Sequence, residues 1–259
     1  MAEHEVRFEI QGSKGVITID REAARNALSG EVVEGILKSL AQAEADKAVR
    51  VIIMTGAGTR VFCAGGDLSG MSGEGFLGGH DGRRRFGQLL TAFRQARKPS
   101  IARVNGHALA GGLGLMLACD FAVAADSAGF GTPEIDRGLF PMMVVALLQR
   151  HLGPKRALDM ALTGERITAH QALAWGLVNR VVPASGLDAE VDALASTLAG
   201  KSQAVLALGR RAYFAAEDLA LGPALELLSA NLSLNVLADD AGEGVSAFLE
   251  KRPPKWNDR

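Results

Sequence analysis

The sequence predicts an α/β fold, in which a mixed β/α core is followed by a helical tail. Two observations support this prediction. Short runs rich in β-branched residues alternate with segments of helical spacing up to Gly153, and beyond it nearly everything has helical character apart from a strand near Val181. The expected strands are residues 6–10, 16–20, 49–55, 101–104, 121–124 and 178–182.

Size and composition are those of an ordinary globular protein. The chain has 259 residues, of which 48% are hydrophobic and 22% charged, so it can bury a core and is not disordered as a whole. A formal net charge of -1 gives no electrostatic reason to expect nucleic acid or a membrane as the main partner. The longest apolar stretch, residues 139–148, is shorter than the roughly 20 residues that span a bilayer.

The N-terminus and the cysteines indicate a cytoplasmic protein without a disulfide framework. Residues 1–7 are charged and lack the apolar stretch of a secretory signal. Cys63 and Cys119 have apolar neighbours, form no CxxC pair and have no histidine at ligand spacing. We therefore expect buried free thiols and no metal site.

Local signals place several helices and one long loop. Ser29 is typical of a helix N-cap, and the helix that it predicts continues through Leu40. Its apolar stripe consists of Val32, Val33, Ile36, Leu37 and Leu40. Between Gly65 and Gly82 the many glycines predict a loop, either a lid over a site or a solvated connector.

Two glycine-rich segments are the strongest functional signal, because each follows a β-like run and precedes a helix-like one. They read Cys-Ala-Gly-Gly-Asp-Leu at positions 63–68 and Val-Asn-Gly-His-Ala-Leu-Ala-Gly-Gly at positions 104–112. Glycine lets the main chain approach a ligand closely, and exposed N–H groups at such turns bind a negative oxygen. Two such turns that converge on one carbonyl would form an oxyanion hole. The pattern predicts an enzyme that acts on a carbonyl or thioester.

The candidate donors are the main-chain N–H groups of Gly66 and Gly111. Gly111 precedes the apolar residues 113–119, which predict a helix whose N-terminus carries a partial positive charge. A purely structural role in the turns is the alternative for both glycines. Asp67 is interpreted as the N-cap of a helix that begins at Leu68.

Glu134 is the candidate proton acceptor. It lies among proline and apolar residues in Phe-Gly-Thr-Pro-Glu-Ile, positions 130–135. A carboxylate in such surroundings is partly desolvated, which makes it a better base near neutral pH. A glutamate on a surface loop is the alternative.

Several segments, taken in order, resemble the crotonase, or enoyl-CoA hydratase/isomerase, superfamily over almost the whole chain. They are residues 21–28, 63–68, 98–106, 110–112, 119–120, 130–134, 162–164 and 246–252. The resemblance implies an α/β fold, a crotonase-like spiral of ββα units with a C-terminal helical trimerisation region. It also implies a homotrimer or hexamer. We therefore expect residues 1–195 to form a spiral core that binds acyl-CoA, and residues 196–259 to form a helical region for oligomerisation.

The resemblance also implies which residues form the site. Gly66 and Gly111 match the family's oxyanion hole, and Glu134 matches its second catalytic glutamate. Coenzyme A would be bound near Arg25, Ala64, Gly65 and Leu68, with Phe248 and Lys251 approaching across a subunit boundary or making a plain oligomer contact. Coenzyme A enters as part of the substrate, so no separate cofactor and no metal are expected.

Met142 is assigned to the acyl pocket. It lies in Phe-Pro-Met-Met-Val-Val, positions 140–145, where the family usually has a small glycine-rich turn. Methionine adapts to irregular shapes, which suits a flexible acyl pocket. Filling of the core is the alternative.

One departure from the family pattern bears on the reaction. Two-glutamate hydratases carry their first catalytic glutamate where this chain has Gly114. Two carboxylates readily activate water and protonate the α-carbon, whereas a single one suits transfer of a proton from C2 to C4 of a 3-enoyl-CoA. We therefore expect double-bond isomerisation first and hydration of a 2-enoyl-CoA second. Decarboxylation or carbon–carbon cleavage of acyl-CoA is the third possible reaction. A scaffold that binds coenzyme A without catalysis is the alternative from outside the enzymes.

Overall fold

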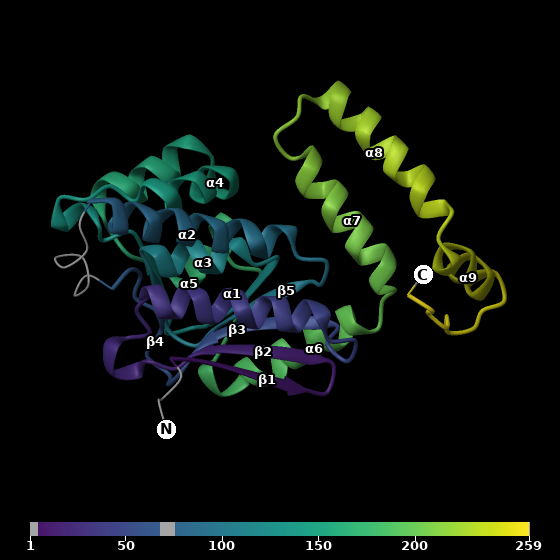
Figure 1. The fold of residues 1–259 in the computed structure, drawn as a ribbon, viewed down its shortest axis with the longest axis horizontal. Coiled ribbons are helices and arrows are strands. Elements are labelled where there is room, and N and C mark those ends of the chain that lie inside the picture. The colour runs from purple at the N-terminus through teal and green to yellow at the C-terminus, as the bar shows by residue number, and fades with distance from the viewer. Residues whose placement is uncertain (1–4, 68–75, 259) are drawn as a thin grey trace.

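The computed structural model describes residues 5–67 and 76–258, which form two β-sheets surrounded by helices (Figure 1). Within these residues, the larger sheet has the strand order β1-β2-β3-β5-β7-β10 and the smaller one β4-β6-β8-β9. The strands of the larger sheet are β1 (Val6–Gln11), β2 (Lys14–Ile19), β3 (Val51–Gly56), β5 (Ser100–Val104), β7 (Phe121–Ala125) and β10 (Arg180–Val182). They coincide with the six strands predicted from the sequence, which confirms the α/β class.

The larger sheet is buried on both faces at its centre. β1 and β2 form an antiparallel hairpin, and the following strands pair in parallel. Side chains of a strand alternate between its two faces. Ile52 and Met54 of β3 therefore join the main core, while Val51 and Ile53 join a second core on the opposite face.

Helices cover both faces of this sheet. The main core contains residues of α1 (Gly30–Ala45), α2 (Phe76–Gln95), α3 (Gly111–Ala118), α4 (Met142–Thr163) and α5 (Ala169–Trp175), and the second core contains α6 (Leu187–Ala199). The predicted start of α1 is confirmed, because the Ser29 hydroxyl accepts the N–H of Val32. The predicted stripe is buried at Val32, Val33, Ile36 and Leu40.

The loop predicted between Gly65 and Gly82 is wrong in its second half. The helix α2 begins at Phe76, and residues 68–75 lie outside the described part of the chain. Leu89 and Phe93 of α2 are fully buried in the main core. Helices in proteins are stabilised chiefly by packing of their apolar face, so this burial outweighs the poor helix propensity of the glycines at the start of α2.

The smaller sheet was not expected from the sequence. Its strands are β4 (Val61–Cys63), β6 (His107–Leu109), β8 (Gly129–Gly131) and β9 (Ile167–Thr168). β4, β6 and β8 pair in parallel, and β9 pairs antiparallel with β8. Cys63, the first residue of the first glycine-rich segment, lies in β4, and residues 107–109 of the second segment form β6.

The C-terminal helices extend away from the core (Figure 1). They are α7 (Gln203–Ala216), α8 (Leu221–Val236) and α9 (Asp239–Leu249). α7 is fixed to the core by Arg210, whose guanidinium pairs with Asp120 at 2.6 Å. Within the described chain, no individual helix has the length and hydrophobicity to cross a membrane, although α8 and α9 with a 74° bend between them meet the length and composition criteria together.

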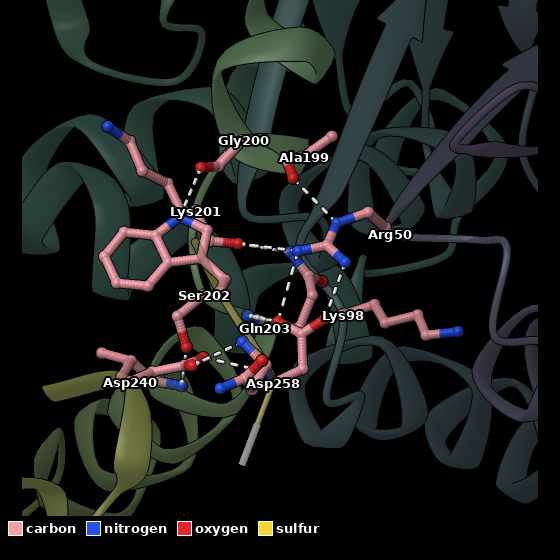
Figure 2. Close-up of polar contacts among 12 residues, drawn as sticks. Arg50, Lys98, Ala199, Gly200, Lys201, Ser202, Gln203, Asp240 and Asp258 are labelled. Carbon is pink, nitrogen blue, oxygen red and sulfur yellow. Dashed lines mark hydrogen bonds and ion pairs between the residues drawn. The ribbon is translucent and has the colours of Figure 1, made fainter. Parts of the chain in front are cut away.

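A polar network joins the C-terminal segment to the core (Figure 2). Arg50, which directly precedes β3, pairs with Asp258 at 2.7 Å and donates to the carbonyls of Ala199 and Lys201. Asp258 also accepts the N–H of Gln203, the first residue of α7. Asp258 is therefore linked both to the residue that precedes β3 and to the start of α7.

Asp240 completes this network from α9. Its side chain is buried, and its two oxygens accept the N–H groups of Asn257 at 2.7 Å and Asp258 at 3.0 Å. The Trp256 indole N–H donates to the Gly200 carbonyl at 2.8 Å. Asp240 thus couples α9 to the chain end.

Asp240→Ala is expected to lower the free energy of unfolding by about 2 kcal/mol, because two buried N–H groups lose a charged acceptor. Asp239→Ala is the matched control, since Asp239 occupies the same first turn of α9 but is exposed. Urea denaturation of both variants at equal protein concentration measures the difference. Equal losses would show that the helix dipole and not the network accounts for the effect.

Candidate active site

Three strands of the smaller sheet end at one edge, and a candidate residue follows each of them. Gly66 follows β4, Gly111 follows β6 and Glu134 follows β8, each within three residues of the strand's end. These strands are neighbours that run parallel, so their carboxyl ends meet at the same edge. The fold therefore brings the three residues to one edge, with Gly111 after the middle strand.

The two glycine-rich loops touch through their main chains. A Cβ on Gly65 would lie 2.5 Å from the Cβ of Ala110 and 3.1 Å from the N atom of Gly111. A Cβ on Gly112 would lie 2.2 Å from the carbonyl oxygen of Cys63. Gly65 also has a φ of +97°, in the left-handed region that favours glycine. Both loops therefore need glycine in order to approach each other.

The N–H groups of Gly66 and Gly111 are available to a ligand. Among the hydrogen bonds of the described residues, neither N–H serves as a donor. Gly111 is the first residue of α3, where N–H groups have no partner within the helix and the helix dipole is positive. Ala110 before it has φ +51° and ψ −130°, a strained conformation for a residue with a side chain. The backbone at this turn is therefore held by its surroundings.

Glu134 is half-buried and has an unpaired oxygen. Its Oε2 atom is buried and has no hydrogen-bond partner within the described part of the chain. Burial raises the pKa of the Glu134 carboxyl, although a backbone N–H and the charge of Arg137 partly oppose this rise. A buried carboxylate without a partner is costly, so such groups are frequent at functional sites. The environment favours the base interpretation over a surface-loop glutamate.

Gly114 faces apolar side chains. A Cβ at this position would lie 3.3 Å from Val144 Cγ2, 3.7 Å from Phe86 Cζ and 3.8 Å from Leu90 Cδ1. A carboxylate here would be packed between α2, α3 and α4 with these apolar groups as its nearest neighbours. The position that could carry a second glutamate is therefore apolar in this protein.

Comparison with known proteins gives a consistent result over the full chain. Residues 9–259 match the profile of the enoyl-CoA hydratase/isomerase family. A putative enoyl-CoA hydratase of Thermus thermophilus is 35% identical over 249 residues, covering 95% of this chain and 98% of the relative. The 2,3-dehydroadipyl-CoA hydratase of Escherichia coli is 37% identical over 246 residues, covering 94% and 95%. The chain belongs to the enoyl-CoA hydratase/isomerase family.

Solved structures of this family share the fold. The enoyl-CoA hydratase of Bacillus anthracis superimposes with a TM-score of 0.93 at 31% identity, covering 98% of this chain and all of that one. The crotonase-like α/β fold with C-terminal helices that the resemblance implied is therefore confirmed. The protein is an enzyme of the enoyl-CoA hydratase/isomerase type that acts on acyl-CoA.

Three of the residues expected to bind coenzyme A lie in or next to the first glycine-rich loop. The Ala64 N–H donates to the Arg25 carbonyl at 3.1 Å, and the Leu28 N–H donates to the Gly65 carbonyl at 2.8 Å. The Arg25 side chain is exposed. Arg25, Ala64 and Gly65 are therefore neighbours, and Leu68 lies outside the described residues.

The remaining expected residues are exposed apolar or charged groups. Met142 begins α4 and is 71% exposed, whereas Met143 beside it packs against the core, so Met142 is not core filling. Phe248 is 81% exposed on α9, and Lys251 follows that helix. α9 lies at the opposite end of the molecule from β4 (Figure 1). One chain by itself therefore does not bring Phe248 and Lys251 to the edge that holds Gly66.

Two charged residues beside the site were not recognised from the sequence as a pair. Arg21 pairs with Asp67 through Nη1 and Oδ2 at 3.0 Å. The helix that Asp67 was expected to cap would begin outside the described residues. Because 45 residues separate the two partners in the chain, no local pattern indicates their contact.

Gly65→Ala is expected to destabilise the protein more than Gly12→Ala. Both glycines have positive φ, but a Cβ on Gly12 meets no atom within 4 Å. Backbone strain alone predicts a loss of about 1 kcal/mol for Gly12→Ala, and the clash with the second loop adds about 1–3 kcal/mol for Gly65→Ala. Chemical denaturation of the two variants measures the difference. Equal losses would contradict the close contact between the loops.

Proposed function

We propose that this enzyme hydrates a 2-enoyl-CoA thioester to a 3-hydroxyacyl-CoA, with Glu134 as its single acid–base group. The observation that carries the proposal is the unpaired, buried Oε2 atom of Glu134 at the edge where two unengaged amides follow parallel strands. Gly114 in place of a second glutamate favours isomerisation, but both relatives named above are called hydratases, which supports hydration, the second expectation from the sequence.

A single carboxylate can complete the addition of water. In the proposed step the Glu134 carboxylate takes a proton from water, and the oxygen of that water forms a bond to C3 of the substrate. The electron pair of the C2–C3 double bond moves toward the thioester oxygen, where the N–H groups of Gly66 and Gly111 stabilise the enolate. The enolate then collapses, and C2 takes the proton back from Glu134. The two hydrogens and the oxygen of one water are thereby added.

Isomerisation is the second candidate, and Gly114 favours it. With an apolar group in place of a second carboxylate, one base can remove a proton from C2 of a 3-enoyl-CoA and return it at C4. This reaction adds no oxygen to the product, whereas hydration does. The label of H2(18O) in the product therefore separates the two reactions.

Glu134→Gln is expected to lower kcat for hydration by at least about 100-fold, because the only acid–base group of the mechanism is removed. The test incubates wild type and variant with 2-enoyl-CoA and 3-enoyl-CoA in H2(18O), and mass spectrometry follows the products. Asp136→Asn is the matched control, since this neighbouring carboxylate is exposed. Unchanged turnover in Glu134→Gln would exclude the proposed base.

Glu134→Gln is also expected to change how the free energy of unfolding depends on pH. Because the folded pKa of Glu134 is raised, its ionised form destabilises the folded state above that pKa, and the penalty is absent below the unfolded pKa. Glu134→Gln should therefore be more stable than wild type at neutral pH, with the difference disappearing in acid. Wild-type activity should fall as the pH falls through the raised pKa, because the base becomes protonated.

The coenzyme A part of the substrate is proposed to lie along the first glycine-rich loop. Arg25, Ala64 and Gly65 are neighbours there, and Leu68 is proposed to bind coenzyme A with them. The exposed Met142 would contact the acyl chain. Coenzyme A enters as part of the substrate, and no other cofactor takes part in the proposed chemistry. The cytoplasmic location stays a prediction from the N-terminal sequence.

The C-terminal helices are proposed to assemble the protein into trimers or hexamers. α8 has no buried residue in this chain. The exposed apolar side chains of α7, α8 and α9 and their connections include Tyr213, Leu221, Leu225, Leu232, Leu237 and Phe248. Large exposed apolar patches mark interaction sites, and a cavity of about 420 Å³ lies between α7 and α8. Assembly would also allow Phe248 and Lys251 to reach a neighbour's site.

The boundary expected after residue 195 between the core and the helical region falls within α6. Because α6 packs on the larger sheet, we propose that the region for oligomerisation begins at α7.

Leu232→Asp is expected to reduce the mass of the assembly, because a charge is placed on the apolar surface of α8. Light scattering coupled to gel filtration measures the mass. Ser229→Asp is the control, since it adds the same charge at an exposed polar position of the same helix. An unchanged mass in Leu232→Asp would show that this face is not used.

A further inference from the structure

Gly66 has no packing of its own that fixes its orientation. A Cβ at Gly66 would meet no atom of the described residues within 4 Å, and the residue is exposed. The direction of its N–H must therefore be set by the residues on either side. An oxyanion donor that is free to rotate stabilises a transition state poorly, because catalysis requires preorganised dipoles.

Both flanks of Gly66 are bound to the segment formed by residues 21–28. The Leu28 N–H donates to the Gly65 carbonyl at 2.8 Å, and the Asp67 N–H donates to the Leu28 carbonyl at 3.0 Å. These two bonds form a parallel bridge between Leu28 and Gly66. The peptide groups on both sides of Gly66 are thus held by one short segment.

Arg21 joins that segment to Asp67 through its side chain. Its Nη1 atom donates to the Ala27 carbonyl at 2.9 Å and to Asp67 Oδ2 at 3.0 Å. The side chains of Arg21 and Asp67 are each 18% exposed, so solvent screens the pair less than a surface pair. One guanidinium nitrogen therefore contacts both the segment and the residue next to Gly66.

A second contact of Arg21 joins it to Glu5 and does not involve Asp67. Its Nε atom pairs with Glu5 Oε1 at 2.7 Å, and the other Glu5 oxygen accepts the Ser29 hydroxyl at 2.7 Å. Through Glu5, Arg21 is therefore linked to the N-terminal end of the described chain and to the start of α1. The two ion pairs of Arg21 can be removed separately, by substitution at Glu5 or at Asp67.

We propose that Arg21 is a positioning residue, which acts through Asp67 to aim the Gly66 N–H at the thioester oxygen of the substrate. The proposal rests on the function proposed above. Loss of the Arg21–Asp67 contact should leave substrate binding nearly intact and weaken the interaction that develops in the transition state.

The test uses Asp67→Ala and Asp67→Asn, with Glu5→Gln as the matched control for the other ion pair. We expect kcat for 2-enoyl-CoA hydration to fall about 10- to 100-fold in Asp67→Ala with KM changed less than about threefold. Asp67→Asn keeps an acceptor for Arg21 and should lie between Asp67→Ala and wild type. Glu5→Gln should keep the wild-type kcat. A purely structural pair would affect Glu5→Gln and Asp67→Ala alike, or would change stability without changing kcat.

An infrared measurement reads the oxyanion hole without turnover. In the Glu134→Gln background, the C=O stretch of bound 2-enoyl-CoA should shift to lower frequency relative to the free thioester, because hydrogen bonds polarise the carbonyl. Asp67→Ala in this background should lose part of that shift, while Glu5→Gln should keep it. A full shift in Asp67→Ala would overturn the role of Arg21, whereas no shift in the Glu134→Gln parent would instead contradict the proposed oxyanion hole.

Discussion

The main-chain contact between the loops after β4 and β6 is the constraint on which the site depends. The contact needs glycine at positions 65 and 112, and it needs β4 and β6 to run parallel side by side. Two buried asparagines hold the chain that enters β4. The side-chain amide of Asn26 donates to the Val61 carbonyl at 2.8 Å, and that of Asn105 donates to the Gly58 carbonyl at 2.8 Å. Satisfied buried amides rigidify a structure, so the start of β4 is as well defined as its end.

Burial shifts the pKa values of three titratable groups on the strands of the smaller sheet or just after them, and the shifts have different consequences. Burial raises the pKa of the Glu134 carboxyl more than a backbone N–H and the charge of Arg137 lower it, which makes this carboxylate a stronger proton acceptor than an exposed one. Burial also raises the pKa of the Cys63 thiol to about 12, so the sulfur at the end of β4 stays protonated. Burial and two nearby arginines lower the pKa of His107 at the start of β6, which keeps its imidazole neutral. Of these three groups, Glu134 is thus the one whose environment favours the proposed role of a proton acceptor.

The larger sheet could be predicted from the sequence and the smaller one could not, for a physical reason. The strands of the larger sheet are long or apolar enough to show as β-branched, apolar runs in the sequence, and the N-cap Ser29 indicates where α1 begins. Strands of two or three residues, such as β8 and β9, are too short to display alternation, and they exist because neighbouring strands pair with them. The glycine-rich loops were visible without their sheet, because their composition reports a backbone requirement. The Arg21–Asp67 pair was not visible, because it depends on tertiary contact alone.

The division of labour between main chain and side chains explains why a common fold supports related reactions. The amides of Gly66 and Gly111 belong to the backbone, so relatives that share about a third of their residues can retain them while most side chains change. The path of the proton depends instead on side chains, and at position 114 this chain has a glycine whose nearest neighbours are apolar side chains. A second carboxylate placed against Val144 and Phe86 would itself be desolvated, which would raise its pKa. In the proposed hydration, Glu134 alone would therefore accept the proton that leaves water and return it to carbon.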